Sequence, residues 1–206
     1  MSAIAPKSKT TSTSELNTKR DVAQVHALEI DKPIICSIIG ACAGLGLVTA
    51  CMADVRFASA KGVKFTTAFA KRGLIAEHGI SYVLPRIVGQ ARAMDLLLSS
   101  RVVLSDEALS MGLVNKLYPD AETCLKESIA YAQEMVKFCS PVALAEIKKQ
   151  IYSGWGLTPR EDYARAETLM LKSFKHPDFK EGVASLVDKR DPKFQGIKAG
   201  FIRDIQ

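Results

Sequence analysis

The stretch from Ile34 to Asp54, IICSIIGACAGLGLVTACMAD, constrains the fold of this 206-residue chain more than any other. It starts with apolar and β-branched residues, passes through Gly40, Gly44 and Gly46, and continues with small apolar residues at helical spacing. This order predicts a buried strand, a tight glycine turn and a helix that begins directly after the turn. The first N–H groups of such a helix have no partner within it, and its dipole is positive at that end. We therefore expect a site that holds a developing negative charge.

The composition is that of a globular protein with one core. Of its residues 48% are hydrophobic, and no apolar run approaches the roughly 20 residues that a membrane-spanning helix needs. The formal charge of +6 is not gathered into a basic stripe, so we expect no nucleic-acid partner and no membrane span. The five cysteines are odd in number and lack C-x-x-C spacing. They indicate buried free thiols in a reducing compartment, with no metal site.

Three segments differ in composition. Residues 1–21 are rich in Ser, Thr and Lys and hold few large apolar side chains, so we expect a disordered tail. A mitochondrial transit peptide would be richer in Arg, which favours a cytoplasmic location with a mitochondrial one as the alternative. Residues 22–118 alternate strand and helix patterns, and residues 119–206 are helical in pattern. The expected strands after the glycine turn are 55–58 and 63–67, and the expected helices are 45–53, 80–88 and 91–99.

Helix ends and helix faces can also be predicted. Ser105 is expected to cap a helix that Gly112 ends, and Pro85 is expected to kink or shorten the helix over 80–88. In the C-terminal segment, apolar residues recur every three or four positions and predict the packed faces of three helices. These faces are Leu125, Ile129, Ala132, Val136 and Cys139; Leu144, Ile147 and Ile151; and Tyr163, Ala166, Met170 and Phe174.

Five motifs in order give the chain from Lys32 onward a recognisable pattern. They are DKP followed by an apolar strand and GACAGLG, then ADVRFA, RGLI leading to LPRIVG, ALSMGLVN, and finally FKEGV with KRDPKF. In this order they resemble the crotonase (enoyl-CoA hydratase/isomerase) superfamily. Each motif alone is weak, but five in register are specific to a family.

The resemblance implies an α/β fold, namely a partial crotonase-like ββα superhelix that lacks the first strands, with a helical C-terminal trimerisation region. It implies an acyl-CoA thioester ligand, with coenzyme A as part of the substrate and no separate cofactor. A homo-trimer or hexamer is expected, or an assembly with full-length family members. The chemistry passes through an enolate whose oxygen is held by two backbone N–H groups, the second of which belongs to Leu45. The substrate-binding residues implied are Gly40, Ala41, Gly44, Gly46 and Phe69.

The chain departs from the family pattern in ways that bear on activity. The family's strand-rich segment before the DKP motif, which carries the first of the two donors, is much longer than the segment here. Val48 and Phe69 stand where hydratases carry their two glutamates, and neither can transfer a proton. Glu77 matches the acidic base of the family's isomerases, and one carboxylate suffices to shift a double bond. The resemblance therefore favours an enoyl-CoA isomerase over a hydratase.

Other interpretations of the same residues stay open. Glu77 could be an ordinary exposed loop residue, and the glycines could serve only the packing of a strand against a helix. The alternative to an isomerase is a non-catalytic acyl-CoA binder, or a truncated pseudoenzyme that assembles with full-length crotonase subunits.

Overall fold

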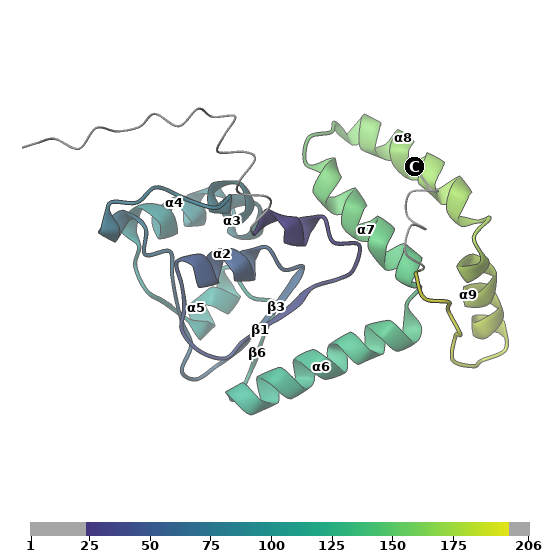
Figure 1. The fold of residues 1–206 in the computed structure, drawn as a ribbon, viewed down its shortest axis with the longest axis horizontal. Helices are drawn as coiled ribbons and strands as arrows, with labels where there is room; N and C mark the ends of the chain where they lie inside the picture. Colours follow the sequence, from purple (N-terminus) through teal and green to yellow (C-terminus); the bar gives the residue numbers. More distant parts are fainter. Residues whose placement is uncertain (1–23, 198–206) are drawn as a thin grey trace, which may run out of the picture.

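Two small sheets organise the first half of the chain in the computed structural model, which describes residues 24–197 (Figure 1). The expected tail, residues 1–21, lies outside the described residues. The first sheet is parallel and has the order β1 (Ile35–Ile38), β3 (Val55–Ser59), β6 (Lys116–Tyr118). The second has the order β2 (Cys42–Ala43), β4 (Lys64–Thr66), β5 (Val103–Leu104). In the second sheet β2 is parallel to β4, and β4 is antiparallel to β5.

Short helices connect and cover these strands. They are the 3-10 helices η1 (Val25–Leu28) and η2 (Ala70–Arg72), and the α-helices α2 (Leu45–Cys51), α3 (Ile80–Val88), α4 (Gln90–Ser99) and α5 (Ser105–Ser110). Helix α3 spans Ile80–Val88, the predicted range, so Pro85 does not shorten it; of the two expected effects of Pro85, only a kink stays open. Gly89 ends the helix as expected, with a positive φ of 82° that glycine adopts without strain.

Ser105 does not cap its helix, so that prediction is wrong. Leu104 occupies the N-cap position, and Ser105 is the first helical residue. The Ser105 hydroxyl is buried and donates a hydrogen bond to the carbonyl oxygen of Ser59 at 2.8 Å. The Ser105 hydroxyl therefore bonds to the last residue of β3 and not to the first turn of its own helix.

The C-terminal segment is helical, as predicted. Its helices are α6 (Ala121–Phe138), α7 (Pro141–Gly154), α8 (Pro159–Ser173) and α9 (Pro177–Val187). Each begins at a side chain that accepts a hydrogen bond from the first turn, and the last three have proline at the start. Figure 1 shows α6 along the first sheet, while α7, α8 and α9 form a group at the right of the view. Within residues 24–197, no helix is both long and apolar enough to cross a bilayer.

The core lies between the two sheets and the short helices. Its largest fully buried side chains include Phe65 of β4, Ile80 and Leu84 of α3, and Met52 at the end of α2. Aromatic contacts join α6 to the sheet, because the Phe57 ring meets Tyr118 and Tyr131 edge to face at 5.7 and 5.2 Å.

The predicted packed faces of α6 and α7 do not face this core. Helix α6 buries Cys124 and Ser128, whereas Leu125, Ile129 and Val136 are 47%, 49% and 82% exposed. Successive helix residues are rotated by 100°, so a shift of one position moves a side chain from one face to the next. The periodicity identified apolar stripes correctly, but within this chain those stripes face outward.

Helix α7 shows the same displacement, and α8 exposes its stripe as well. In α7 the buried residues are Ala145 and Lys148, while Ile147 and Ile151 are exposed. Among the described residues, α8 buries no side chain completely, and Tyr163, Met170 and Phe174 of its predicted face are all exposed.

Candidate functional site

The glycine turn has the predicted course of strand, turn and helix, with the two-residue strand β2 inside the turn as an addition. Gly44 adopts φ 51° and ψ −121°, a combination that residues with a Cβ rarely adopt. Its N–H donates to the carbonyl oxygen of Thr66 at 3.0 Å, and its own carbonyl oxygen accepts from the Val48 N–H at 3.0 Å. Gly44 thus ends the strand pairing and starts α2 at Leu45, the predicted first residue.

The start of α2 is exposed to solvent. The N–H groups of Leu45, Gly46 and Leu47 have no acceptor within the helix, because no residue lies four positions before them in it. The Leu45 side chain is 49% exposed, and a Cβ placed on Gly40 or Gly46 would meet nothing within 4 Å. Leu45 and Gly46 therefore lie at the surface, whereas Leu47 is buried.

The two positions that match the hydratase glutamates are closed. Val48 is fully buried, and Phe69 is 6% exposed within the same hydrophobic core. Phe69 is the N-cap residue of η2, and the whole residue is buried. A direct contact between the Phe69 ring and a ligand therefore stays a prediction.

Glu77 lies in the turn that starts α3. Its side chain is 37% exposed, and its Oε2 atom lies 3.8 Å from Nε2 of His78. The Glu77 carbonyl oxygen accepts the N–H of Ile80 at 3.1 Å, which fixes the backbone of the turn. His78 and Gly79 both have positive φ, 55° and 80°. The Glu77 carboxylate is thus partly exposed, and it precedes two residues with left-handed backbone conformation.

This turn packs against α2 and η1. A Cβ on Gly79 would lie 3.2 Å from Cγ1 of Val25 and 3.5 Å from Cε of Met52, the residue that ends α2. The absence of a side chain at Gly79 therefore lets the Glu77 turn lie close to the C-terminal end of α2. This contact lies at the end of α2 that is opposite Leu45.

A buried charged cluster beside this turn was not predicted. Nζ of Lys148 lies 2.8 Å from Oδ2 of Asp54, and the hydroxyl of Tyr152 donates to Oδ1 of Asp54 at 2.8 Å. Burial, and then the hydrogen bond to the Asp54 carboxylate, raises the pKa of Tyr152 above its usual range. The helical periodicity does not distinguish Lys148 from the other lysines of the C-terminal segment as a buried residue. The ADVRFA motif is the one local signal that sets Asp54 apart.

The thiols are free and buried or partly buried, as predicted. Burial raises the pKa of Cys42 and of Cys51 to about 12, so neither is a reactive thiolate near neutral pH. Among residues 24–197, no group of three or more His, Cys, Asp or Glu side chains could hold a metal ion.

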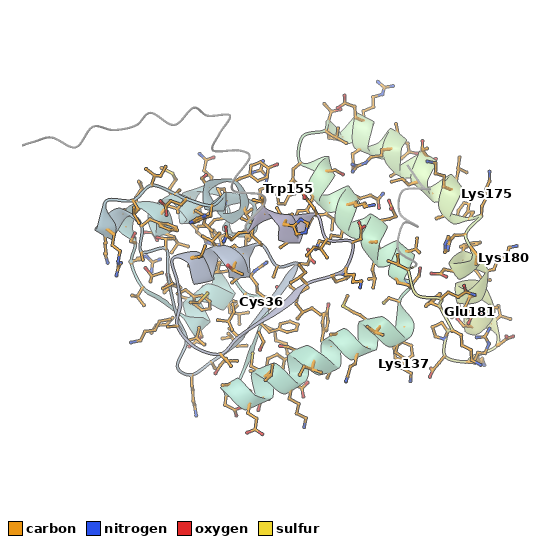
Figure 2. All side chains as sticks on the ribbon, in the orientation of Figure 1. Cys36, Lys137, Trp155, Lys175, Lys180 and Glu181 are labelled. Atoms are coloured by element: carbon orange, nitrogen blue, oxygen red, sulfur yellow. The ribbon has the colours of Figure 1, made fainter. Side chains whose placement is uncertain are left out.

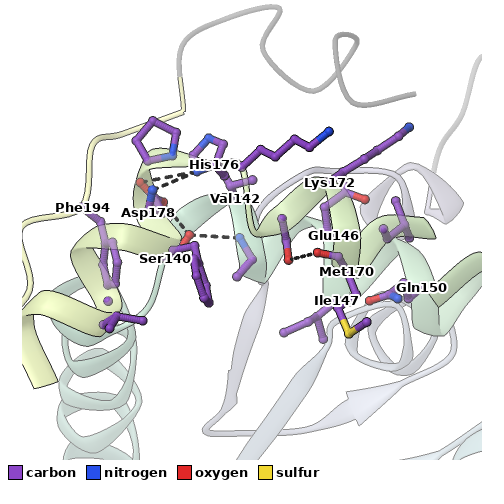
Figure 3. A pocket seen from close by; sticks show the side chains of 18 of the residues that line it. Ser140, Val142, Glu146, Ile147, Gln150, Met170, Lys172, His176, Asp178 and Phe194 are labelled. Atoms are coloured by element: carbon purple, nitrogen blue, oxygen red, sulfur yellow. Dashed lines mark hydrogen bonds and ion pairs between the residues drawn. The ribbon is translucent and has the colours of Figure 1, made fainter. Parts of the chain in front are cut away.

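A hollow lies among α7, α8 and α9, apart from the predicted site residues (Figure 3). It measures about 970 Å³ and is lined mostly by apolar side chains such as Ile147, Met170 and Phe194. Ser140 and Asp178 close one side of it with a hydrogen bond between their side chains.

Comparison with known proteins gives a consistent family. The family model for enoyl-CoA hydratase/isomerase matches residues 3–197. A probable enoyl-CoA hydratase of Mycobacterium tuberculosis is 34% identical over 168 residues, which cover 80% of this chain and 58% of that protein. The 1,2-epoxyphenylacetyl-CoA isomerase of Escherichia coli is 31% identical over 172 residues, which cover 82% and 63%.

Solved structures agree with this comparison. An enoyl-CoA hydratase from Polaromonas sp. JS666 superposes with a TM-score of 0.78 at 26% identity, covering 89% of this chain and 72% of that one. The chain spans only 58–63% of the length of the curated relatives named above.

Proposed function

This chain belongs to the enoyl-CoA hydratase/isomerase family, and on that premise we propose that it binds an acyl-CoA thioester and moves a double bond along the acyl chain. In the proposed reaction, the Glu77 carboxylate removes a proton from C2 of a 3-enoyl thioester. The electrons of that C–H bond move toward the thioester, and negative charge develops on its oxygen. The same carboxyl group then returns the proton to C4, which leaves the double bond between C2 and C3.

The position of Glu77 is the observation that carries the proposal. Its carboxylate is partly exposed, so it can reach a ligand, and its backbone is fixed by the Ile80 N–H and by the contact of Gly79 with α2. A fixed base within reach of the proton is what general acid–base catalysis requires. Among residues 24–197, its one ion-pair neighbour is His78, at 3.8 Å.

The main-chain N–H of Leu45 supplies the proposed anion-stabilising contact. Fixed donors aimed at a developing oxyanion are usually the largest catalytic contribution, and losing one costs on the order of 10²–10³ in rate. The first N–H groups of α2 have no acceptor in the helix, and the Leu45 side chain is turned partly to solvent. The open surfaces at Gly40, Ala41, Gly44 and Gly46 are the proposed contacts with the thioester.

Addition of water is disfavoured by the side chains at the two hydratase positions. The two-carboxylate route needs one group to deliver the proton and another to activate water. Val48 and Phe69 are apolar and buried, so neither can do so. A single carboxylate at Glu77 is enough for isomerisation but not for that route.

An alternative is an acyl-CoA binder that does not turn over. It is favoured by one observation, namely that apolar, buried side chains, Val48 and Phe69, stand at the two positions where hydratases carry glutamates. The family resemblance assigns the first oxyanion donor to sequence before the DKP motif. Such a chain could act in an assembly with full-length subunits.

An oligomer, either a trimer or a hexamer, is part of the proposal. Its support is the outward apolar stripes of α6, α7 and α8, since Val136, Ile151 and Tyr163 are 82%, 58% and 67% exposed. Apolar stripes on adjoining helices are typical of surfaces covered by another chain. Light scattering on the purified chain measures the assembly directly.

The test of the proposed reaction compares Glu77→Gln with His78→Gln on a panel of 3-enoyl-CoA esters. We expect Glu77→Gln to lower the rate of double-bond migration by about 10²–10⁴, the usual contribution of a positioned acid–base group, while binding of the ester stays unchanged by calorimetry. His78→Gln is the matched control and should retain most of the rate. Full activity in Glu77→Gln contradicts the mechanism, whereas binding without turnover in the unmodified chain supports the alternative.

A further inference from the structure

The ammonium group of Lys148 uses all three of its hydrogen-bond donors inside the protein. It lies 2.8 Å from Oδ2 of Asp54, donates to the carbonyl oxygen of Ala27 at 2.8 Å, and donates to that of Lys32 at 3.1 Å. The Lys148 side chain is only 5% exposed. A lysine this buried is tolerated because each of its donors has a partner.

Two of these three acceptors, Ala27 and Asp54, belong to the two segments that contact Gly79, whereas Lys32 lies between η1 and β1. Val25 lies in η1 two residues before Ala27, and Met52 ends α2 two residues before Asp54. A Cβ on Gly79 would contact both Val25 and Met52, at 3.2 and 3.5 Å. The Lys148 ammonium group therefore links η1 to the end of α2, the two segments against which the Glu77 turn packs.

The face of α7 that carries Lys148 also contacts the segment after α2 and helix α3. Tyr152 and Trp155 follow Lys148 at four and seven positions, the spacing of one helix face. Tyr152 donates to Asp54, and the Trp155 ring meets the Tyr82 ring at 5.3 Å. Arg86 of α3 lies between them, with its guanidinium 3.8 Å from the Tyr82 ring centre and 4.9 Å from that of Trp155. Figure 2 shows Trp155 where α7 meets the first half of the chain.

We infer that Lys148 is a positioning residue for the Glu77 turn: its ammonium fixes η1 to the end of α2, and the Gly79 backbone rests between them. The catalytic meaning of this inference rests on the proposed function, because it assumes that Glu77 is the acid–base group. The structural part does not depend on it. Through α7, the C-terminal helices are thereby tied to the candidate site.

The experiment is hydrogen exchange on Lys148→Met, which removes the charge and keeps most of the side chain. Lys149→Met is the matched control, because Lys149 is the next residue and makes longer ion pairs, at 3.4 and 3.5 Å, on a more exposed surface. The probes are the amides of Ile80, Tyr82 and Val83, which bond to Glu77 and Gly79. In Lys148→Met we expect these amides to exchange at least about tenfold faster, with amides of α6 changed far less.

Two outcomes overturn the inference. One is unchanged exchange at the start of α3, and the other is an equal increase in α3 and α6, which would show only a general loss of stability. Should Lys148→Met fail to fold, Tyr152→Phe removes a single hydroxyl from the same cluster and keeps the ring. It should raise exchange at the same amides in the same direction by a smaller factor, and no change there would refute the inference.

Kinetics separate this inference from the proposed function. With a 3-enoyl-CoA that the unmodified chain isomerises, Lys148→Met should lower kcat and leave KM nearly unchanged, because the base is misplaced while the ester still binds. A rise in KM at constant kcat would contradict a positioning role. An unmodified chain that shows no turnover would refute the proposed function, while the exchange result would still decide the role of Lys148.

Discussion

Replacement of Gly79 by alanine tests whether the Glu77 turn depends on close packing against η1. Gly79 has φ 80°, a backbone conformation that costs a residue with a Cβ about 1–2 kcal/mol. The added methyl would also lie 3.2 Å from Cγ1 of Val25, closer than the roughly 3.5–4.0 Å at which two carbon atoms attract best. Crowding of this kind costs a further 1 kcal/mol or so.

A second glycine separates the two costs. Gly73 has φ 70°, but a Cβ there would meet nothing within 4 Å. Gly73→Ala should therefore cost only the backbone contribution of about 1–2 kcal/mol, and Gly79→Ala about 2–3 kcal/mol. For a chain of this size each kcal/mol lowers the melting temperature by about 2–4 °C. Thermal melting followed by circular dichroism measures both.

The double variant Val25→Ala with Gly79→Ala completes the test. Removing Cγ1 of Val25 relieves the close contact, so the double variant should be about 1 kcal/mol more stable than the sum of the two single changes predicts. Equal melting temperatures for Gly79→Ala and Gly73→Ala, or strict additivity in the double variant, would refute the packing argument and with it the fixed position of the Glu77 turn.

Two further predictions concern stability. Burial raises the pKa of Cys42 and of Cys51 to about 12, against 9.0 for an ordinary thiol. As pH rises, the unfolded chain therefore loses these two protons before the folded chain does. The free energy of unfolding should consequently fall between about pH 9 and pH 12. Urea titrations at pH 8 and 10 measure this fall, and an equal fall in a Cys42→Ala, Cys51→Ala variant would contradict the assignment. Asp120→Ala removes the side chain that accepts the Thr123 N–H at 2.7 Å at the start of α6 and should cost about 1 kcal/mol in the same titration, whereas no loss would show that the cap is dispensable.

The local signals in the sequence predicted the glycine turn well. The apolar run, Gly44 and the small residues after it describe a strand, a turn and a helix whose first residue is Leu45, as the structure has it. The strands β2 and β5 have two residues each, too few for any periodicity to reveal them. They form because each pairs with β4, and this pairing depends on the tertiary structure.

The helix faces show the limit of periodicity. It predicts that α6 and α7 have apolar stripes but not what the stripes face, and Leu125 and Ile147 point away from the chain's own core. The Lys148 cluster could not be predicted because its partners are distant in sequence. Ala27 lies 121 residues away from Lys148, and Tyr152 lies 98 residues from Asp54. A buried charge has no local pattern until its partners are known.

The assignment of Glu77 as the acid–base group depends on both the sequence and the packing. Glu77 was found through the family pattern, and its partial exposure alone would suit an ordinary loop residue. The packing of Gly79 between Val25 and Met52 is the added observation, because it fixes the backbone that carries the carboxylate. The family pattern named the residue, and the packing explains how it can be held in one place.

The most direct measurement follows one labelled proton through the proposed reaction. The purified chain is given a 3-enoyl-CoA that carries deuterium at C2, and the product is analysed by mass spectrometry and NMR. A single carboxyl group that takes and returns the proton predicts a 2-enoyl-CoA with part of the deuterium at C4, and loss of this product in Glu77→Gln. No 2-enoyl product, or the same product and rate in Glu77→Gln, would contradict the account.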